Sequence, residues 1–461
     1  MHILLLAIPA VHAVVPAEVT RTQAPDAAYG SSIGLDINDD GRVLVEAGGV
    51  PAYWDEDGTF TVLEGSQYPS VYDLNEAGQT VGGGVDGFLW NADGTIAQTV
   101  ELGTRVMAYR LNDLGDFVGT WHNWPYTTMQ AFAWFTTTGA VEITGFERTP
   151  EYVWPSVNNP GQVSGYYRDT NDDFHCWYWS RTDGYMEISE VSGDCIAGRM
   201  TDAGVLAGTF LANTGSDTPF VWSVEGGLEL LELPVGYWGW TGGMNRQGWV
   251  TGWGEDASGA SVGLVWDGSG ALVHEIRDER WPTLRFRDIN DQGHVSGVGE
   301  TASGHVEALF WSEATGLVLL PGIGGTSTFA GGLNELDQVV GTGKDAAGRQ
   351  HALRWDVSYD TEVPVDEALQ EIVTFVDAAV AAGTLVGSGR GGSADGRLAA
   401  LVNMLEAVED LLAVGDVDGA REQLLAVLDR TDGAPQPPDF VAGSAAAELA
   451  ARVTELLAEL E

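Results

Sequence analysis

The stretch Gln130-Ala131-Phe132-Ala133-Trp134 decides the fold, because its pattern of a small residue, an apolar residue and a tryptophan recurs along the chain. The recurring tryptophans are Trp54, Trp90, Trp134, Trp179, Trp222, Trp266, Trp311 and Trp355. After a first interval of 36 residues, successive tryptophans lie 43 to 45 residues apart. Self-similarity at this period indicates a repeat protein in which each repeat is one supersecondary unit.

A second motif keeps the same period: an asparagine followed three residues later by a glycine. An Asn side chain bonds the backbone two residues on, and Gly adopts the left-handed conformation without a Cβ clash, so the motif predicts a tight hairpin turn. Thr201 replaces the asparagine once, and Asp337 replaces the glycine in the last repeat. The asparagines are Asn38, Asn75, Asn112, Asn158, Asn245, Asn290 and Asn334.

Each repeat contains patterns for four short strands, with the tryptophan on the third, which is typical of a β-propeller blade. After Trp355 the chain leaves the last repeat without a fourth strand, whereas residues 14–19 form an unassigned strand pattern. Pairing these two segments would remove two exposed sheet edges. We therefore predict an eight-bladed propeller over residues 14–358; seven blades or an open solenoid are the alternatives.

These repeats resemble the HAF repeat family of bacterial extracellular proteins. The resemblance rests on the pattern Ile-Asn-x-x-Gly-x-Val-x-Gly followed by His-Ala-Phe-x-Trp, and it covers residues 28 to 358. The histidine of the pattern is present only at His175 and His351. The resemblance implies a secreted or surface location and no established catalytic activity.

The pattern changes to helical periodicity after residues 359–365, which we interpret as a linker. Apolar residues at helical spacing predict four helices, at residues 366–382, 398–414, 416–428 and 444–460, and hence a small bundle over residues 366–461. The segments Val380–Leu385, Leu401–Leu412 and Val414–Leu424 resemble the FIMAH domain, a helical module at the C-termini of secreted bacterial proteins. That resemblance implies an accessory or attachment module.

Composition limits the partners. The net charge is −46, and the acids are spread over the whole chain: residues 365–461 hold 18 acids and 5 bases, and the remainder holds 49 and 16. The negative electrostatic field of such a surface argues against nucleic acid and anionic membranes as partners. Residues 1–13 form a short apolar run that we interpret as a signal peptide, with a buried strand as the alternative. No run of 18 apolar residues follows, so no membrane span is predicted.

Two cysteines, Cys176 and Cys195, suit a disulfide in an oxidising compartment, although Cys176 also occupies a repeat position for small residues and a buried thiol is equally consistent. No motif for a catalytic nucleophile, zinc or phosphate is present, so no catalytic residue and no cofactor are predicted. Residues 36–41 imitate a calcium loop, but Ala47 stands where the closing glutamate is needed, and the identity of any metal stays open.

Seven of the nine tryptophans outside the repeat position are candidates for ligand binding, since exposed aromatic rings stack on sugars or pack in protein interfaces. Packing between blades is the competing interpretation. These residues are Trp121, Trp124, Trp154, Trp238, Trp240, Trp253 and Trp281. The sequence thus favours a non-catalytic scaffold that binds surface polysaccharide or protein. A polysaccharide-degrading propeller enzyme, marked by non-repeat charged residues at the central channel, and a structural surface-layer component are the alternatives.

Overall fold

The computed structural model describes residues 17–25, 30–65, 70–123, 129–146, 148–188, 194–212, 217–359, 365–389, 392–413, 417–431 and 439–459. The chain divides into two compact units, Met1–Tyr359 and Asp360–Glu461. The first unit is built from strands and the second mostly from helices. The predicted fold class, a mainly β propeller followed by a small helical domain, is therefore confirmed. The predicted signal peptide at residues 1–13 lies outside the described residues.

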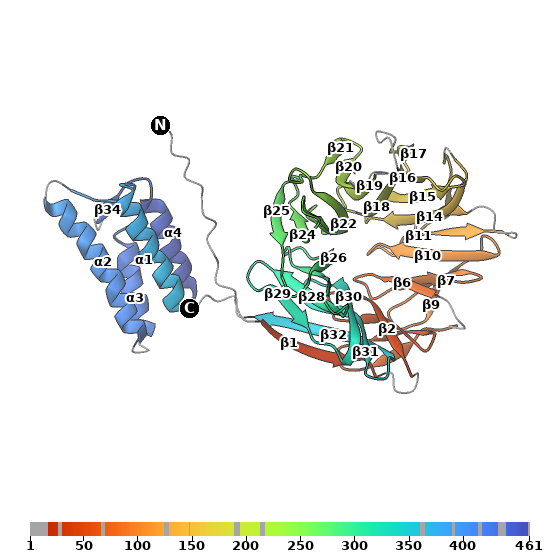
Figure 1. Ribbon diagram of the computed structural model, residues 1–461, viewed down its shortest axis with the longest axis horizontal. Helices are drawn as coiled ribbons and strands as arrows, with labels where there is room; N and C mark the ends of the chain where they lie inside the picture. Colours follow the sequence, from red (N-terminus) through yellow and green to blue (C-terminus); the bar gives the residue numbers. More distant parts are fainter. Residues whose placement is uncertain are drawn as a thin grey trace. The chain divides into compact units, whose positions relative to one another are not determined.

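Four-stranded antiparallel groups make up the first unit and surround a common centre (Figure 1). Among the described residues, six of these groups are separate sheets, and two more share a single parallel bridge between Val306 and Ser327. We interpret each group as one blade and number the blades 1 to 8 along the chain. The first strand of each group is the innermost strand of its blade.

The blades have the following strands. Blade 1 is β2 (Ser32–Ile37), β3 (Val43–Ala47), β4 (Val50–Trp54) and β5 (Phe60–Val62). Blade 2 is β6 (Ser70–Leu74), β7 (Thr80–Gly83), β8 (Gly87–Trp90) and β9 (Ile96–Val100). Blade 3 is β10 (Arg105–Leu111), β11 (Phe117–His122), β12 (Gln130–Phe135) and β13 (Gly139–Ile143). Blade 4 is β14 (Pro150–Val157), β15 (Val163–Asp169), β16 (Phe174–Ser180) and β17 (Gly184–Glu187).

The second half continues the series. Blade 5 is β18 (Asp194–Met200), β19 (Leu206–Leu211), β20 (Thr218–Ser223) and β21 (Gly227–Leu230). Blade 6 is β22 (Trp238–Met244), β23 (Val250–Glu255), β24 (Ser261–Trp266) and β25 (Leu272–Ile276). Blade 7 is β26 (Thr283–Ile289), β27 (Val295–Glu300), β28 (Val306–Ser312) and β29 (Gly316–Leu320). Blade 8 is β30 (Gly324–Leu333), β31 (Gln338–Asp345), β32 (Gln350–Tyr359) and the N-terminal strand β1 (Ala17–Gln23).

The N-terminal strand β1 completes blade 8 by pairing antiparallel with β32, from Ala17 opposite Tyr359 to Gln23 opposite Leu353. The predicted partner of this strand is correct, but the strand continues to Gln23 rather than ending at residue 19; residues 14–16 of the predicted stretch lie outside the described residues. Only Ala17 and Val19 pack against the blade 8 core, and the rest of the strand is polar and exposed. No apolar alternation therefore marks its true extent in the sequence.

The repeat tryptophans form the blade cores. Seven of them are 0 to 8% exposed, and Trp134 is partly buried against Phe117. Indole N–H groups also bond backbone carbonyls at 2.7 to 3.0 Å in three blades, in the pairs Trp90–Glu64, Trp266–Glu232 and Trp355–Pro321. In these three blades a large buried side chain with a satisfied polar atom stabilises the packing.

The asparagines of the turn motif link neighbouring blades, in addition to shaping the turns. Each Nδ2 donates to the backbone carbonyl of the corresponding residue in the next blade, at 2.9 to 3.3 Å. The last of these bonds runs from Asn334 to Asn38 and joins blade 8 to blade 1. We call this ring the asparagine belt. It lacks one member, because Thr201 in blade 5 has no amide to donate to Asn245 of blade 6.

Completing the belt is expected to stabilise the propeller. The Thr201 Oγ1 already accepts the N–H of Val205 at 3.2 Å, as the asparagine Oδ1 does at the same position in other turns. Thr201→Asn preserves that acceptor and adds a donor toward Asn245, so we expect the free energy of unfolding to rise by about 1 kcal/mol. Chemical denaturation checks this, with Thr201→Ala as the control that loses the acceptor. An unchanged or lower denaturation midpoint in the asparagine variant would contradict it.

In the last turn, Asp337 stands in place of the glycine, and its side chain contacts the neighbouring blade. Asp337 adopts a left-handed backbone with φ of 57°. Its carboxylate Oδ1 accepts a hydrogen bond from Asn290 Nδ2 at 3.0 Å and lies 2.8 Å from His294 Nδ1, both in blade 7. These contacts hold the conformation that glycine adopts without strain elsewhere.

The second unit is a helical bundle with its own core. Its helices are α1 (Val365–Ala381), α2 (Gly392–Ala413), α3 (Val417–Leu428) and α4 (Ala446–Glu459), and two short strands pair beside them, β33 (Val386–Gly387) and β34 (Val441–Ala442). Apolar residues of all four helices pack together, among them Ile372, Leu405, Leu424 and Val453. Helix α2 begins six residues before its predicted start at residue 398.

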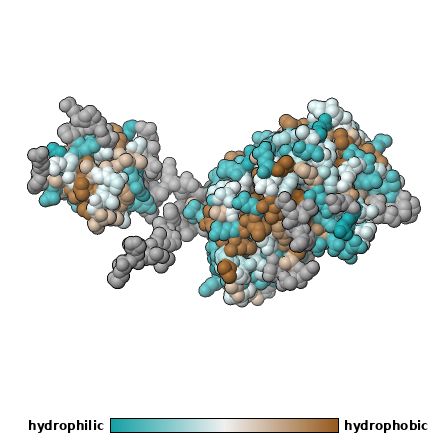
Figure 2. Space-filling view, turned by 90° about the horizontal axis from the view of Figure 1, so that it is seen from above, coloured by the Kyte–Doolittle hydropathy of each residue, from teal (hydrophilic) through white to brown (hydrophobic). Residues whose placement is uncertain are grey.

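The surface is consistent with the acidic composition. Hydrophilic and intermediate residues cover most of the face seen in Figure 2, with separate hydrophobic patches. None of the helices in the described part of the chain is both long enough and apolar enough to cross a membrane.

Candidate functional site

Two cavities lie on the propeller axis, since each is lined by first strands of blades from around the ring. The acidic cavity, of about 220 Å³, is bordered by the asparagine turns and the ends of the first strands. The aromatic cavity, of about 450 Å³, is lined by the residues of these strands that come just before those ends, and Trp154 and Trp240 border it. Its volume is within the range of about 300 to 1,000 Å³ that is common for small-molecule sites.

A β-bulge in the first strand aims side chains at this axis. In seven blades the register between the first and second strands shifts just after the residue four places before the Asn or Thr of the turn. Bulges re-aim side chains and occur often beside active sites. The residue two places before the turn asparagine or Thr201 lies at this bulge in those seven blades, and Ser156 holds the same place in blade 4 without a bulge; we call it the axial position. Its occupants are Asp36, Asp73, Arg110, Ser156, Arg199, Gly243, Asp288 and Gly332.

A glycine in the second strand allows the first strand to approach closely. A Cβ on Gly119 would lie 2.0 Å from the carbonyl oxygen of Met107, and one on Gly252 would lie 2.0 Å from that of Trp240. No side chain can be accommodated at such distances without moving the first strand. The repeat motif therefore includes this glycine because the first strand passes too close to it for a side chain.

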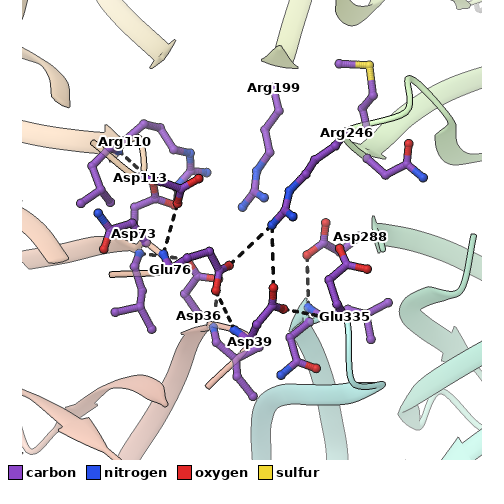
Figure 3. Close-up of a pocket in the computed structure, with 18 of the residues that line it drawn as sticks. Asp36, Asp39, Asp73, Glu76, Arg110, Asp113, Arg199, Arg246, Asp288 and Glu335 are labelled. Atoms are coloured by element: carbon purple, nitrogen blue, oxygen red, sulfur yellow. Dashed lines mark hydrogen bonds and ion pairs between the residues drawn. The ribbon is translucent and has the colours of Figure 1, made fainter. Parts of the chain in front are cut away.

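The residues that follow the turn asparagine, or Thr201, form a charged rim around the acidic cavity. The backbone N–H of seven of them donates to the side chain of the next rim residue, at 2.8 to 3.2 Å. Arg246 interrupts the acidic series and lies 3.8 to 4.0 Å from carboxylates of three other blades, those of Asp39, Glu76 and Asp291 (Figure 3). The remaining rim residues are Asp113, Asn159, Asp202 and Glu335.

Charged axial residues separate the two cavities. Asp36 and Asp288 accept the backbone N–H of Leu74 and Leu333 in the next blade, at 3.1 and 3.2 Å. Arg199 extends into the space between the axial carboxylates (Figure 3). It makes no hydrogen bond or ion pair with another residue in the described part of the chain, and its side chain is exposed to the cavities.

Asp73 is the third axial aspartate, and it contacts two residues of blade 3. Asp73 accepts the N–H of Leu111 at 2.9 Å and lies 3.3 Å from the Arg110 guanidinium. Asp73 thus repeats the link that Asp36 and Asp288 make to the next blade. The axial aspartates therefore have a structural role in addition to any chemical one, because each joins its blade to its neighbour.

Burial and neighbouring charges at the axis shift the pKa values of Asp36, Asp288 and Arg199. Burial, assisted by the nearby charge of Asp73, raises the pKa of Asp36 to about 7 against the opposing effect of Arg199 and Arg110. Burial likewise raises the pKa of Asp288. The surrounding carboxylates, Asp288 first, raise the pKa of Arg199, which therefore stays charged.

This shift predicts a pH dependence of stability. The ordinary pKa of Asp36 is 3.8 and the folded value is about 7, so folding retains a proton between these values. Stability therefore falls as the pH rises through this window. We expect the melting temperature to drop less between pH 5 and pH 8 in Asp36→Asn than in the wild type. Asp40→Asn, an exposed acid of the adjacent turn, controls for net charge. Equal slopes in the wild type and Asp36→Asn would contradict the assignment.

Aromatic side chains line the other cavity. Trp154, Trp240, Tyr72 and Tyr166 border it, and all four are partly exposed. Trp154 stacks on Tyr109 with ring centroids 4.9 Å apart. Partly exposed aromatic rings beside polar groups suit the alternating apolar and hydroxyl faces of a sugar.

A second layer fixes these rings. The Trp240 indole stacks on Trp253 at 6.0 Å, and its Nε1 donates to Asp217 Oδ2 at 2.6 Å. Trp238 contacts the edge of Trp253 at 5.6 Å and donates to Glu255 at 3.3 Å. Such locked orientations reduce the entropy lost on binding.

The predicted ligand tryptophans therefore separate into groups. Trp154 and Trp240 meet at the aromatic cavity, with Trp253 and Trp238 packed behind Trp240. Trp121 is partly buried against the core shared by blades 2 and 3. Trp124 lies outside the described residues. The remaining prediction, for Trp281, is wrong.

The Trp281 side chain is only 3% exposed and packs in the core of blade 7. Its Nε1 donates to Glu307 at 2.7 Å, which satisfies the polar atom inside the protein. Trp281 thus lies in the segment between β25 and β26, outside any strand, and its side chain is nevertheless buried.

The cysteines form a bridge between blades. Cys176 of blade 4 and Cys195 of blade 5 are disulfide-bonded, with Cα atoms 5.7 Å apart. No group of three or more His, Cys, Asp or Glu side chains that could hold a metal occurs among the described residues. Asp36 and Asn38 of the calcium-like segment belong instead to the axis and the asparagine belt.

Sequence reasoning missed the axial position. A signal exists: when the repeats are aligned on the turn, most positions hold similar residues, whereas this one alternates between aspartate, arginine, serine and glycine. The tryptophan candidates supplied only the aromatic part of the site.

No protein-family model matches the chain, and no curated protein matches it. Among solved structures, it is similar to dipeptidyl peptidase 4 of Porphyromonas gingivalis, with 10% identity over 73% of this chain and a TM-score of 0.49. The match covers 58% of that peptidase.

Two other structures show comparable likeness. The β-propeller domain of the trilobed protease from Pyrococcus furiosus matches with 11% identity, 72% of this chain, all of that domain and a TM-score of 0.43. A mutant Aleuria aurantia lectin in complex with α-methyl-L-fucoside matches with 10% identity, 66% of this chain, 95% of the lectin and a TM-score of 0.31. At these scores the likenesses add no argument to the strand pairing described above.

Proposed function

We propose that this protein is a secreted or cell-surface scaffold that binds saccharides non-catalytically at the aromatic cavity. One observation carries the proposal: Trp154 and Trp240, from blades 4 and 6, border one cavity whose floor holds carboxylates and guanidinium groups. Aromatic rings can stack on the apolar face of a sugar, while Asp36, Ser156 and Arg199 can bond its hydroxyls.

Other features support an extracellular setting. The apolar segment at residues 1–13 is typical of a signal peptide, and the disulfide is typical of oxidising compartments. The HAF-like repeats and the FIMAH-like helices point the same way, with the helical domain as an attachment or accessory module. A protein surface displaying an aromatic side chain is the alternative ligand of the same cavity.

A glycan-array screen of the full chain, repeated with the propeller and helical units expressed separately, tests the proposal. Saccharide binding by the full chain and the propeller, but not by the helical unit, is the expected result. Binding confined to the helical unit, or no binding to saccharides or cells by any of the three, would overturn it.

A second candidate, a polysaccharide-degrading enzyme, is favoured by the charged axial residues, which break the repeat at the central channel. A carboxyl with a pKa raised to about 7, Asp36, is suited to a general acid, and Asp73 supplies a second carboxyl nearby. Chromatography of oligosaccharides incubated with the protein distinguishes the candidates. Shortened products that disappear in Asp36→Asn would establish the enzyme, and unchanged oligosaccharides would support the scaffold.

A further inference from the structure

Three arginines line the aromatic cavity, and two of them, Arg199 and Arg287, differ from the third, Arg110. The chain has 67 acids against 21 bases, and many described arginines form ion pairs, as Arg42, Arg110 and Arg277 do. Arg199 and Arg287 line the aromatic cavity without a hydrogen bond or ion pair to any other described residue. Arg199 faces the axial carboxylates, Asp288 first, which raise its pKa, but neither guanidinium group is fixed by a hydrogen bond to another described residue.

A further arginine extends this group. Arg285 also lacks a hydrogen bond or ion pair within the described part of the chain, and its guanidinium lies 5.1 Å from the ring centre of Trp253. Trp253 in turn stacks on Trp240, which borders the cavity. Arg105, at the start of β10, likewise makes no hydrogen bond or ion pair with another described residue, but it does not line the cavity. Within the described residues, guanidinium groups without such partners therefore lie in and beside the aromatic cavity.

The carboxylates in the same cavity are engaged. Asp36 and Asp288 each accept two backbone N–H groups, one from the following residue and one from the next blade. Their oxygens are therefore partly occupied, whereas the guanidinium forks of Arg199 and Arg287 are open. A planar guanidinium matches a carboxylate with two parallel hydrogen bonds.

We propose that the ligand is an acidic saccharide of the uronic-acid class, whose carboxylate binds Arg199 while its ring stacks on the cavity aromatics. Arg287 at the cavity wall provides a second cation for the same or the adjacent sugar unit. This inference rests on the proposed saccharide-binding function and specifies the substrate class of that site.

Isothermal titration with two matched probes tests it: a tetramer of galacturonic acid, and the same tetramer with its carboxyl groups reduced to alcohols. We expect the full-length protein to bind the acidic tetramer at least tenfold more tightly. Arg199→Met is expected to lose at least tenfold in affinity for the acidic tetramer and less than threefold for the neutral one. Arg452→Met, which removes one exposed charge from the helical unit, is expected to leave both affinities unchanged.

The outcomes are distinguishable. Equal binding of both tetramers, or a preference for the neutral one, would overturn the inference and leave saccharide binding in place. Failure to bind either tetramer or any glycan of the array would overturn the proposed function itself. Should Arg199→Met unfold because the axial aspartates lose their cation, Arg287→Met, whose side chain is exposed, must show the same selective loss for the acidic tetramer. An unchanged selectivity in Arg287→Met would then contradict the assignment.

Discussion

Replacing Trp240 by alanine is expected to weaken saccharide binding about 30-fold, which corresponds to about 2 kcal/mol. The ring borders the aromatic cavity, and its orientation is fixed in advance by Trp253 and Asp217. Truncation removes the stacking surface and leaves Asp217 without its indole donor. The measurement is the dissociation constant for the tightest saccharide of the array.

Trp238→Ala is a matched control for this change. Trp238 lies two residues earlier on β22, contacts the same Trp253 and donates its indole N–H to a carboxylate, yet it does not line the cavity. We expect its affinity to stay within threefold of the wild type. Equal losses in the two variants would show that the effect arises from a weakened blade 6, and the cavity would lose its assigned role.

Removing the disulfide is expected to cost the propeller about 3 kcal/mol of stability, since cross-linking residues 19 positions apart constrains the unfolded chain. Cys176 and Cys195 join blade 4 to blade 5, and the asparagine belt is incomplete at the next junction, from Thr201 to blade 6. The bridge therefore adds a covalent link at the junction next to the one that lacks a belt bond. Because both side chains are buried, the test uses the double variant Cys176→Ala and Cys195→Ala.

Denaturant unfolding followed by tryptophan fluorescence measures this effect. The wild type treated with reductant is the control, and it should move toward the double variant without any change in sequence. Restoring stability with Thr201→Asn in the double-alanine background would show that both features act on the same region of the ring. Coincident midpoints for the oxidised wild type and the double variant would contradict a stabilising role.

Much of the fold could be predicted because it depends on residues that repeat. The tryptophan period indicates the blade, and the turn asparagine indicates the hairpin, since both express local rules of packing and backbone conformation. The four C-terminal helices follow from apolar spacing, with α3 predicted to within one residue at its start. The inter-blade bonds of the asparagine belt could not be predicted, because they join residues 37 to 46 positions apart, and 296 for the closing bond.

The candidate site was predictable only in its aromatic part. Trp154 and Trp240 could be proposed as ligand residues because they lie outside the repeat position, and the structure brings them to one cavity. Asp36, Arg199 and Asp288 are far apart in the sequence and come together only because the ring places every axial position at the centre. Trp281 shows the opposite error, since a tryptophan in an apparent loop is buried in a blade core.

The most direct test of the account is a crystal structure of the protein with the tightest-binding saccharide. We predict one saccharide per chain, located on the axis between Trp154 and Trp240, with a carboxylate on Arg199. Saccharides bound instead to the outer strands of several blades, or to the helical unit, would contradict the central claim that the axial cavity is the functional site.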